Sequence, residues 1–255
     1  MACLGSAAFA ALVTGCSAAH VFAPDAPPLS RAASEELCEQ ANAARPSVTS
    51  FRSMAESTIT AGRDTVSFRY AIVAREPDSM RIDLLPNEGA FTLGMLTIHG
   101  GESQSVNVQE KTFKRSRGGS TALQEFLGMP GASQEVIQAL VTGVPPLFDC
   151  RRVKLYEEGR RDVTVLDPAA RVAYTIDGDS ARVKRFSMLA PDDEAILAEG
   201  ALYYSRSDSP ASMSLAVHEP HEANGVFLFK KITLNPVIDD VVFEVPVPAG
   251  YEEEE

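Results

Sequence analysis

Tryptophan is absent from this chain of 255 residues, and no lysine or arginine precedes Arg31. After Cys16, no apolar stretch approaches the about 20 residues that a membrane-spanning helix needs. The net charge of −12 argues against a nucleic-acid partner, because nucleic acids are bound by clusters of basic residues. The hydrophobic content of 45% is nevertheless sufficient for a sizeable core, and the length predicts one large β domain or two small ones.

The sequence also lacks the motifs of common catalytic sites, including the G-x-S-x-G elbow, the phosphate loop and H-E-x-x-H. His218 and His221, with Glu219 and Glu222 beside them, are residue types that bind metals. However, Pro220 lies between the two histidines and disfavours a shared helical face, so a polar strand end is the simpler interpretation. We therefore predict a non-enzymatic protein with no metal and no cofactor.

The first 16 residues, "MACLGSAAFAALVTGC", form a short apolar run that ends at Cys16. The run is too short for a membrane span and fits the apolar region of a signal peptide. Val13, Thr14 and Gly15 before Cys16 resemble the lipobox of bacterial lipoproteins, although the usual basic segment is missing. We predict a signal peptide over residues 1–15, a lipid on Cys16 and a Pro-rich tether over residues 16–33. The alternative is an apolar tail without a function.

The four cysteines divide according to this prediction. Cys3 would leave with the signal peptide, and Cys16 would carry the lipid. Cys38 and Cys150 would then remain in a compartment that permits disulfides. The two residues either form a disulfide or remain free buried thiols, which behave as small hydrophobic side chains.

Helix signals occur at three places in the rest of the chain. Ser34 is predicted to cap a helix that ends before Pro46. Thr121, as the first residue of a capping box, and Ser133 are predicted to cap two short helices in the middle of the chain, and each of these helices ends at a glycine.

Before and after the two central helices, apolar residues alternate with a period of two, as in "TVSFRYAIVARE" and "SMRIDLLP". Turn residues separate these runs, which predicts roughly 11 antiparallel strands joined by hairpins. A single sheet of this size must curl or be covered, and the helices are the available cover. We place this domain at residues 34–250, and we expect the acidic residues 251–255 to be a solvated tail without a specific role.

The order of these elements resembles the LolA/LolB family of lipoprotein carriers and receptors. The resemblance rests on "SMRIDLLPNEGAFTLGMLTIHG", "ALQEFLG", "VIQALVTGVP" and "ITLNPVIDDVVFEVPVPAG". It implies a mainly β fold with a few helices, an incomplete antiparallel β-barrel whose helices cover an apolar cavity for acyl chains. The lipidated relative in that family is the outer-membrane receptor, which carries an exposed apolar loop residue. Here that position falls near Glu88, and Phe91 is the nearest apolar substitute.

The predicted cavity consists of the apolar faces of three consecutive strand segments and one face of the second central helix. For any one of these residues, packing in an ordinary core is the alternative. Two functions remain open: an outer-membrane lipoprotein facing the periplasm, which binds acylated lipoproteins or other lipids and works with a periplasmic carrier protein, or a lipoprotein that scaffolds an envelope complex. The predicted cavity residues are Phe68, Tyr70, Ile72, Met80, Ile82, Leu84, Phe91, Leu93, Met95, Val136, Ile137, Leu140 and Val141.

Overall fold

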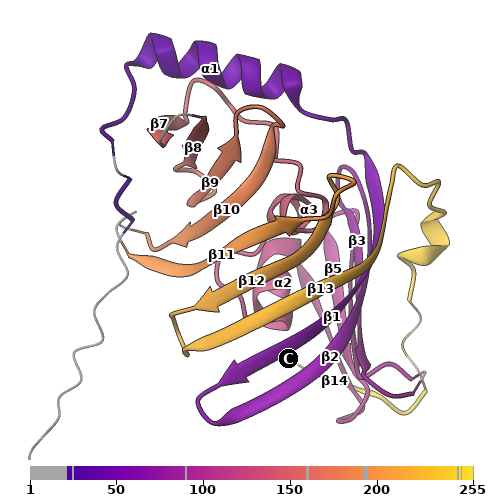
Figure 1. The fold of residues 1–255 in the computed structure, drawn as a ribbon. Coiled ribbons are helices and arrows are strands. Elements are labelled where there is room, and N and C mark those ends of the chain that lie inside the picture. Colours follow the sequence, from indigo (N-terminus) through magenta and orange to yellow (C-terminus); the bar gives the residue numbers. More distant parts are fainter. Residues whose placement is uncertain are drawn as a thin grey trace, which may run out of the picture.

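Strands make up most of the computed structural model, which describes residues 22–24, 26–89, 91–158, 161–191, 195–245, 247 and 249–254. Cys16 and the predicted signal peptide lie outside these residues. The described strands form one curved, unclosed sheet (Figure 1). They are β1 Ser50–Ala61, β2 Asp64–Arg75, β3 Ser79–Pro86, β4 Gly94–His99, β5 Glu102–Asn107, β6 Thr112–Arg117, β7 Lys154–Glu158, β8 Asp162–Asp167, β9 Val172–Asp177, β10 Arg182–Leu189, β11 Ile196–Tyr204, β12 Pro210–Val217, β13 Ala223–Leu234 and β14 Glu252–Glu253.

The sheet is a meander in which neighbours in sequence are mostly neighbours in space. Its strand order is β14-β6-β5-β4-β3-β2-β1-β13-β12-β11-β10-β9-β8-β7. All pairs are antiparallel except β14 with β6, which is parallel and makes the sheet mixed. The predicted mainly β, incomplete barrel is therefore confirmed, but the 14 strands exceed the roughly 11 predicted. The polar segments "ESQSVN" and "TFKRSR" form β5 and β6 without the apolar alternation that identifies a strand from sequence.

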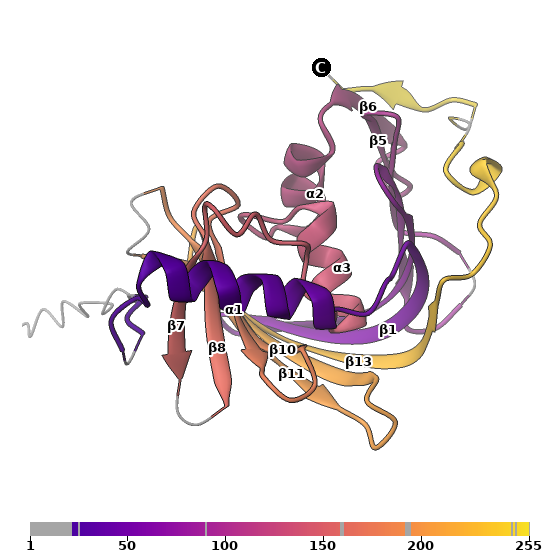
Figure 2. The same ribbon diagram turned by 90° about the horizontal axis from the view of Figure 1, so that it is seen from above.

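Three α-helices accompany the sheet: α1 Arg31–Ala44, α2 Gly119–Leu127 and α3 Gln134–Thr142. A short 3-10 helix, Asp240–Val242, follows β13. In Figure 2, α2 and α3 lie in the hollow of the curved sheet, whereas α1 lies across the end formed by β7 and β8. The predicted helical cover of one concave face is thus provided by α2 and α3.

The helix ends agree with the sequence signals in part. Ser133 caps α3 by accepting a hydrogen bond from the backbone N–H of Val136, as predicted. Two predicted starts are wrong. The N-cap of α1 is Ser30 instead of Ser34, so the helix includes residues 31–33 of the predicted tether. α2 begins at Gly119, which places Thr121 inside the helix.

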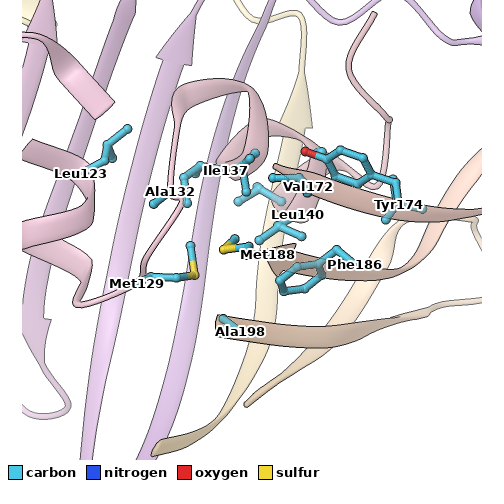
Figure 3. Packing of buried hydrophobic residues seen from close by; sticks show 14 of the residues in the cluster. Leu123, Met129, Ala132, Ile137, Leu140, Val172, Tyr174, Phe186, Met188 and Ala198 are labelled. Carbon is cyan, nitrogen blue, oxygen red and sulfur yellow. The ribbon is translucent and has the colours of Figure 1, made fainter. Parts of the chain in front are cut away.

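The core lies between the concave face of the sheet and the two central helices. Phe51, Ile82 and Leu96 from the sheet, with Leu123 of α2 and Leu140 of α3, are almost completely buried. Figure 3 shows α3 side chains Ile137 and Leu140 pointing toward Met188 of β10. Burial of a side chain of this kind contributes about 1.5–3 kcal/mol, so the helices are held on the sheet mainly by apolar contact.

The N-terminal segment is fastened to the β7 end of the sheet. A disulfide joins Cys38 of α1 to Cys150, with Cα atoms 5.5 Å apart, so the two cysteines are paired instead of free. Asn42 adds two hydrogen bonds to the backbone of Phe148, at 2.9 and 3.1 Å. Before the helix, Phe22 packs edge-on against Tyr156, with ring centroids 6.1 Å apart. Residues 22–24 and 26–44 are therefore held against the β7 end of the sheet.

Gly200 in β11 lies so close to Ser214 and Phe186 that a substitution there tests how tightly the sheet is packed. An added methyl group would overlap the carbonyl oxygen of Ser214 and lie 2.6 Å from a ring carbon of Phe186. We expect Gly200→Ala to lower the free energy of unfolding by about 1–3 kcal/mol, as overpacking does. Urea unfolding followed by circular dichroism measures this. Ala201→Val, whose side chain points to the opposite face, is the control and should stay within about 0.5 kcal/mol.

Candidate functional site

A cavity of about 220 Å³ lies between the concave face of the sheet and the two central helices. Strands β1, β2 and β3 form one wall, and β12 and β13 form the other. The helices cover it with the end of α2 and one face of α3. The residues that line it are Ala55, Ile59, Tyr70, Ile72, Ile82, Leu127, Gly128, Met129, Ile137, Leu140, Val141, Met213, Leu215, Val217, His221, Ala223, Asn224, Gly225, Phe227 and Phe229.

The lining is almost entirely apolar. Its polar side chains are Tyr70, His221 and Asn224, and it includes no Asp, Glu, Lys or Arg. Burial raises the pKa of the Tyr70 hydroxyl, and a hydrogen bond with Ser57 partly offsets this effect, so the phenol is neutral at physiological pH. The Tyr70 ring also packs against Phe227, with centroids 6.0 Å apart. Such a space favours an apolar occupant over a charged one.

The predicted cavity residues fall into two groups. Tyr70, Ile72 and Ile82 from the sheet, with three α3 residues, Ile137, Leu140 and Val141, line the cavity. The others do not. Met80 and Val136 are buried in the core, and Phe68 and Leu84 are half-buried outside the lining.

The predicted face of the fourth strand is wrong by one residue. Leu96 lies directly opposite Ile82, and Ile98 opposite Met80, so these residues share the concave face. Met95 is paired with Asp83 and points to the other side. Because side chains alternate along a strand, the shift of one position moves Leu93 and Met95 off the cavity side. Phe91 lies before β4 and is 58% exposed.

The wall formed by β12 and β13 was not predicted from the sequence, although the alternation of apolar residues in these strands is visible there. Met213, Leu215 and Val217 alternate along β12, and Phe227 and Phe229 alternate along β13. Nothing in this alternation reveals that β13 pairs with β1, a contact between segments more than 160 residues apart. That pairing places the last strands beside the first and completes the cavity.

The two histidines near the end of β12, His218 and His221, have different surroundings. Within the described part of the chain, no three His, Cys, Asp or Glu side chains are placed to hold a metal ion. His218 faces Glu199, with Nε2 and the carboxylate oxygen 3.2 Å apart, whereas His221 lies at the cavity. The described helices include none that is both long and apolar enough to cross a bilayer.

Comparison with known proteins supports the fold through solved structures of low sequence identity. No protein-family model matches the chain, and a search of curated proteins finds no significant match. Among solved structures, a DUF1329 family protein from Desulfovibrio piger has 13% identity and a TM-score of 0.58, covering 84% of this chain and 96% of the other. A LolA superfamily protein from Nitrosomonas europaea has 11% identity and a TM-score of 0.52, covering 83% and 97%.

A third structure, described as a candidate outer membrane lipoprotein-sorting protein domain from Vibrio parahaemolyticus, has 10% identity and a TM-score of 0.58. It is matched over 84% of this chain and 97% of its own. At such low identity these matches show the fold alone. The chain has a LolA-like fold, and the structural similarity extends over 83–84% of its length.

Proposed function

We propose that this protein is a lipid-anchored envelope protein that binds acyl chains of lipoproteins or similar amphiphiles and serves lipoprotein localisation at the outer membrane. The observation that carries the proposal is the uncharged apolar cavity beneath α2 and α3. Transfer of an acyl chain from water to such a lining is favourable by about 0.8 kcal/mol per buried methylene. The lipidated Cys16 would hold the domain at the membrane facing the periplasm.

The helical cover has to move for this function. A volume of about 220 Å³ lies below the about 300–1,000 Å³ of typical ligand pockets. Gly131 and Gly143 flank α3 with φ angles of +76° and +70°, backbone conformations that other residues rarely adopt. We propose these two turns as the hinges about which α3 swings away from β12 and β13. Binding would then convert a small resting cavity into an open groove.

The alternative is a lipoprotein that scaffolds an envelope complex through its outer surface. Two observations favour it: the small resting volume of the cavity, and the exposed side chains of Met54, Val226 and Leu228 on β1 and β13. An acyl-binding assay separates the two functions, because a scaffold does not require the interior.

A substitution that fills the cavity tests the proposal. Ala55 lies on the concave face of β1, is almost fully buried and contacts the cavity. We expect Ala55→Leu to weaken saturable binding of a fluorescent fatty-acyl probe about ten-fold or more, because the larger side chain occupies the acyl site. Fluorescence titration of the chain from Ser17 onward measures the affinity, and urea unfolding verifies that the variant folds.

Thr58→Leu is the matched control, since Thr58 lies on the same strand and is exposed on the opposite face. It should bind the probe like the unaltered protein. Absence of saturable binding to the unaltered protein, or equal weakening by both substitutions, would favour the scaffold.

A further inference from the structure

The outermost long strand at one end of the sheet is basic, in an otherwise acidic protein. Lys111, Lys114, Arg115 and Arg117 occur within seven residues that contain no carboxylate, and the chain as a whole carries −12. Lys114 reaches Glu125 of α2, with Nζ and the carboxylate oxygen 3.1 Å apart. Arg115 and Arg117 are exposed and lie opposite Gln104 and Glu102 of β5. Their side chains therefore share the outer face of the sheet at its margin.

The chain's own acidic end occupies part of this margin. Residues 251–255 were predicted to be a solvated tail, and Glu252–Glu254 are exposed, while Glu252 and Glu253 also form β14 and pair with Thr112 and Phe113 of β6. The backbone N–H of Glu252 donates to the Lys111 carbonyl at 3.0 Å, and the Glu254 N–H donates to Phe113 at 2.8 Å. The margin thus accepts an extended acidic segment through ordinary strand pairing.

This cover is short and leaves most of β6 open. β14 has two residues against the six of β6, and its pairing is parallel, which is slightly less stable per residue than antiparallel pairing. In the described residues, the strand pairing on this side of β6 stops at Phe113 and leaves Lys114–Arg117 without a paired strand. An unpaired strand of this kind is a template for another chain.

Space for a partner's side chains exists beside the same residues. Arg115 and Arg117 line an open groove of about 970 Å³ between β4–β6 and residues 241–245. A strand added along Lys114–Arg117 would place alternate side chains next to Arg115 and Arg117, where opposite charges directly across a pair are favourable. Charge and backbone geometry therefore select the same kind of occupant.

We infer that the outer edge of β6, from Thr112 to Arg117, is a docking site for an acidic extended segment of a partner protein. The segment adds to the sheet as a strand. The chain's own acidic tail covers the site at rest and is displaced by a longer segment that pairs with more of β6. This mode is strand addition, in which main-chain hydrogen bonds give affinity and side-chain complementarity gives specificity. It goes beyond acyl binding and does not depend on the cavity.

The test uses a fluorescein-labelled peptide with the sequence of residues 249–255, AGYEEEE, in fluorescence anisotropy. A chain that ends at Gly250 should bind the peptide at least ten-fold more tightly than the full chain, because a tethered tail competes at a millimolar effective concentration. Raising the salt concentration from 0.05 to 0.5 M should weaken this binding, since exposed charges are screened. Failure of the shortened chain to bind the peptide would overturn the inference.

Matched variants locate the site. In the shortened chain, Arg117→Glu should weaken peptide binding at least ten-fold. Lys154→Glu makes the same charge change at an exposed residue of β7, at the other end of the sheet, and should not weaken binding. A peptide with glutamine in place of every glutamate should also bind more weakly. Two outcomes would contradict an acidic segment as the occupant. One is equal binding of both peptides, and the other is binding of phosphatidylglycerol vesicles without binding of the peptide. Retained fatty-acyl probe binding in the shortened chain separates this result from the proposed function.

Discussion

Replacement of both Cys38 and Cys150 by alanine is expected to lower the free energy of unfolding by about 4–5 kcal/mol. The disulfide closes a loop with a sequence separation of 112 residues, and removing it restores conformational freedom mainly to the unfolded chain. This loss is comparable with much of the total stability of a typical domain. Urea unfolding followed by circular dichroism is the suitable measurement, since the chain has no tryptophan to report by fluorescence.

Reduction of the unaltered protein with dithiothreitol is the control, and it should give the same unfolding midpoint as the double variant. Asn42→Ala, which removes the neighbouring hydrogen bonds to Phe148 but keeps the disulfide, should have a smaller effect, about 1–3 kcal/mol. A loss below about 1 kcal/mol in the double variant would show that packing of α1, and not the covalent bond, fastens this end of the chain.

Substitution of Cys16 by alanine is expected to abolish acyl labelling and to release the protein from membranes. Under the proposed function, the lipid is the anchor, and several acyl chains are needed for stable attachment because a single chain binds only marginally. Metabolic labelling with a radioactive fatty acid, followed by separation of membrane and soluble fractions, measures both effects.

Cys3→Ala is the matched control, because Cys3 belongs to the predicted signal peptide and should leave labelling unchanged. Continued labelling of the Cys16→Ala protein would contradict the assignment of the lipid to this residue. The acyl-probe titration remains informative in that case, since it uses the chain without Cys16.

The sequence was most informative where alternation and capping are local. The apolar alternation in β2 and β3 predicted their concave faces correctly, as the positions of Tyr70 and Ile72 at the cavity and the burial of Ile82 show. Ser133 identified the start of α3 because its side chain caps the helix within one turn. The polar strands β5 and β6 were not recognisable, because they are stabilised by pairing with neighbours and bury few apolar side chains.

The cavity was predictable only in part, for reasons of register and distance. Along β4, both Met95 and Leu96 are apolar, and only the pairing of Leu96 with Ile82 decides which one faces inward. The opposite wall depends on the pairing of β13 with β1, which brings Phe229 beside Ala55. Such long-range pairing is set by closure of the whole meander, and no local pattern encodes it.

With a lipid on Cys16, the attachment of residues 22–24 and 26–44 to the β7 end of the sheet would determine how far the protein extends from a membrane. Five residues lie between Cys16 and Phe22, which makes six Cα-to-Cα steps, so a lipid on Cys16 would keep the β7 end within about 20 Å of the bilayer surface. β14 and β6 lie at the other end of the sheet, where Figure 2 labels β6. Along the sheet, the 14 strands span at most about 62 Å at about 4.8 Å per step. An anchored molecule would therefore have its basic strand no more than about 80 Å from the bilayer surface, so a partner would have to present its acidic segment within that distance.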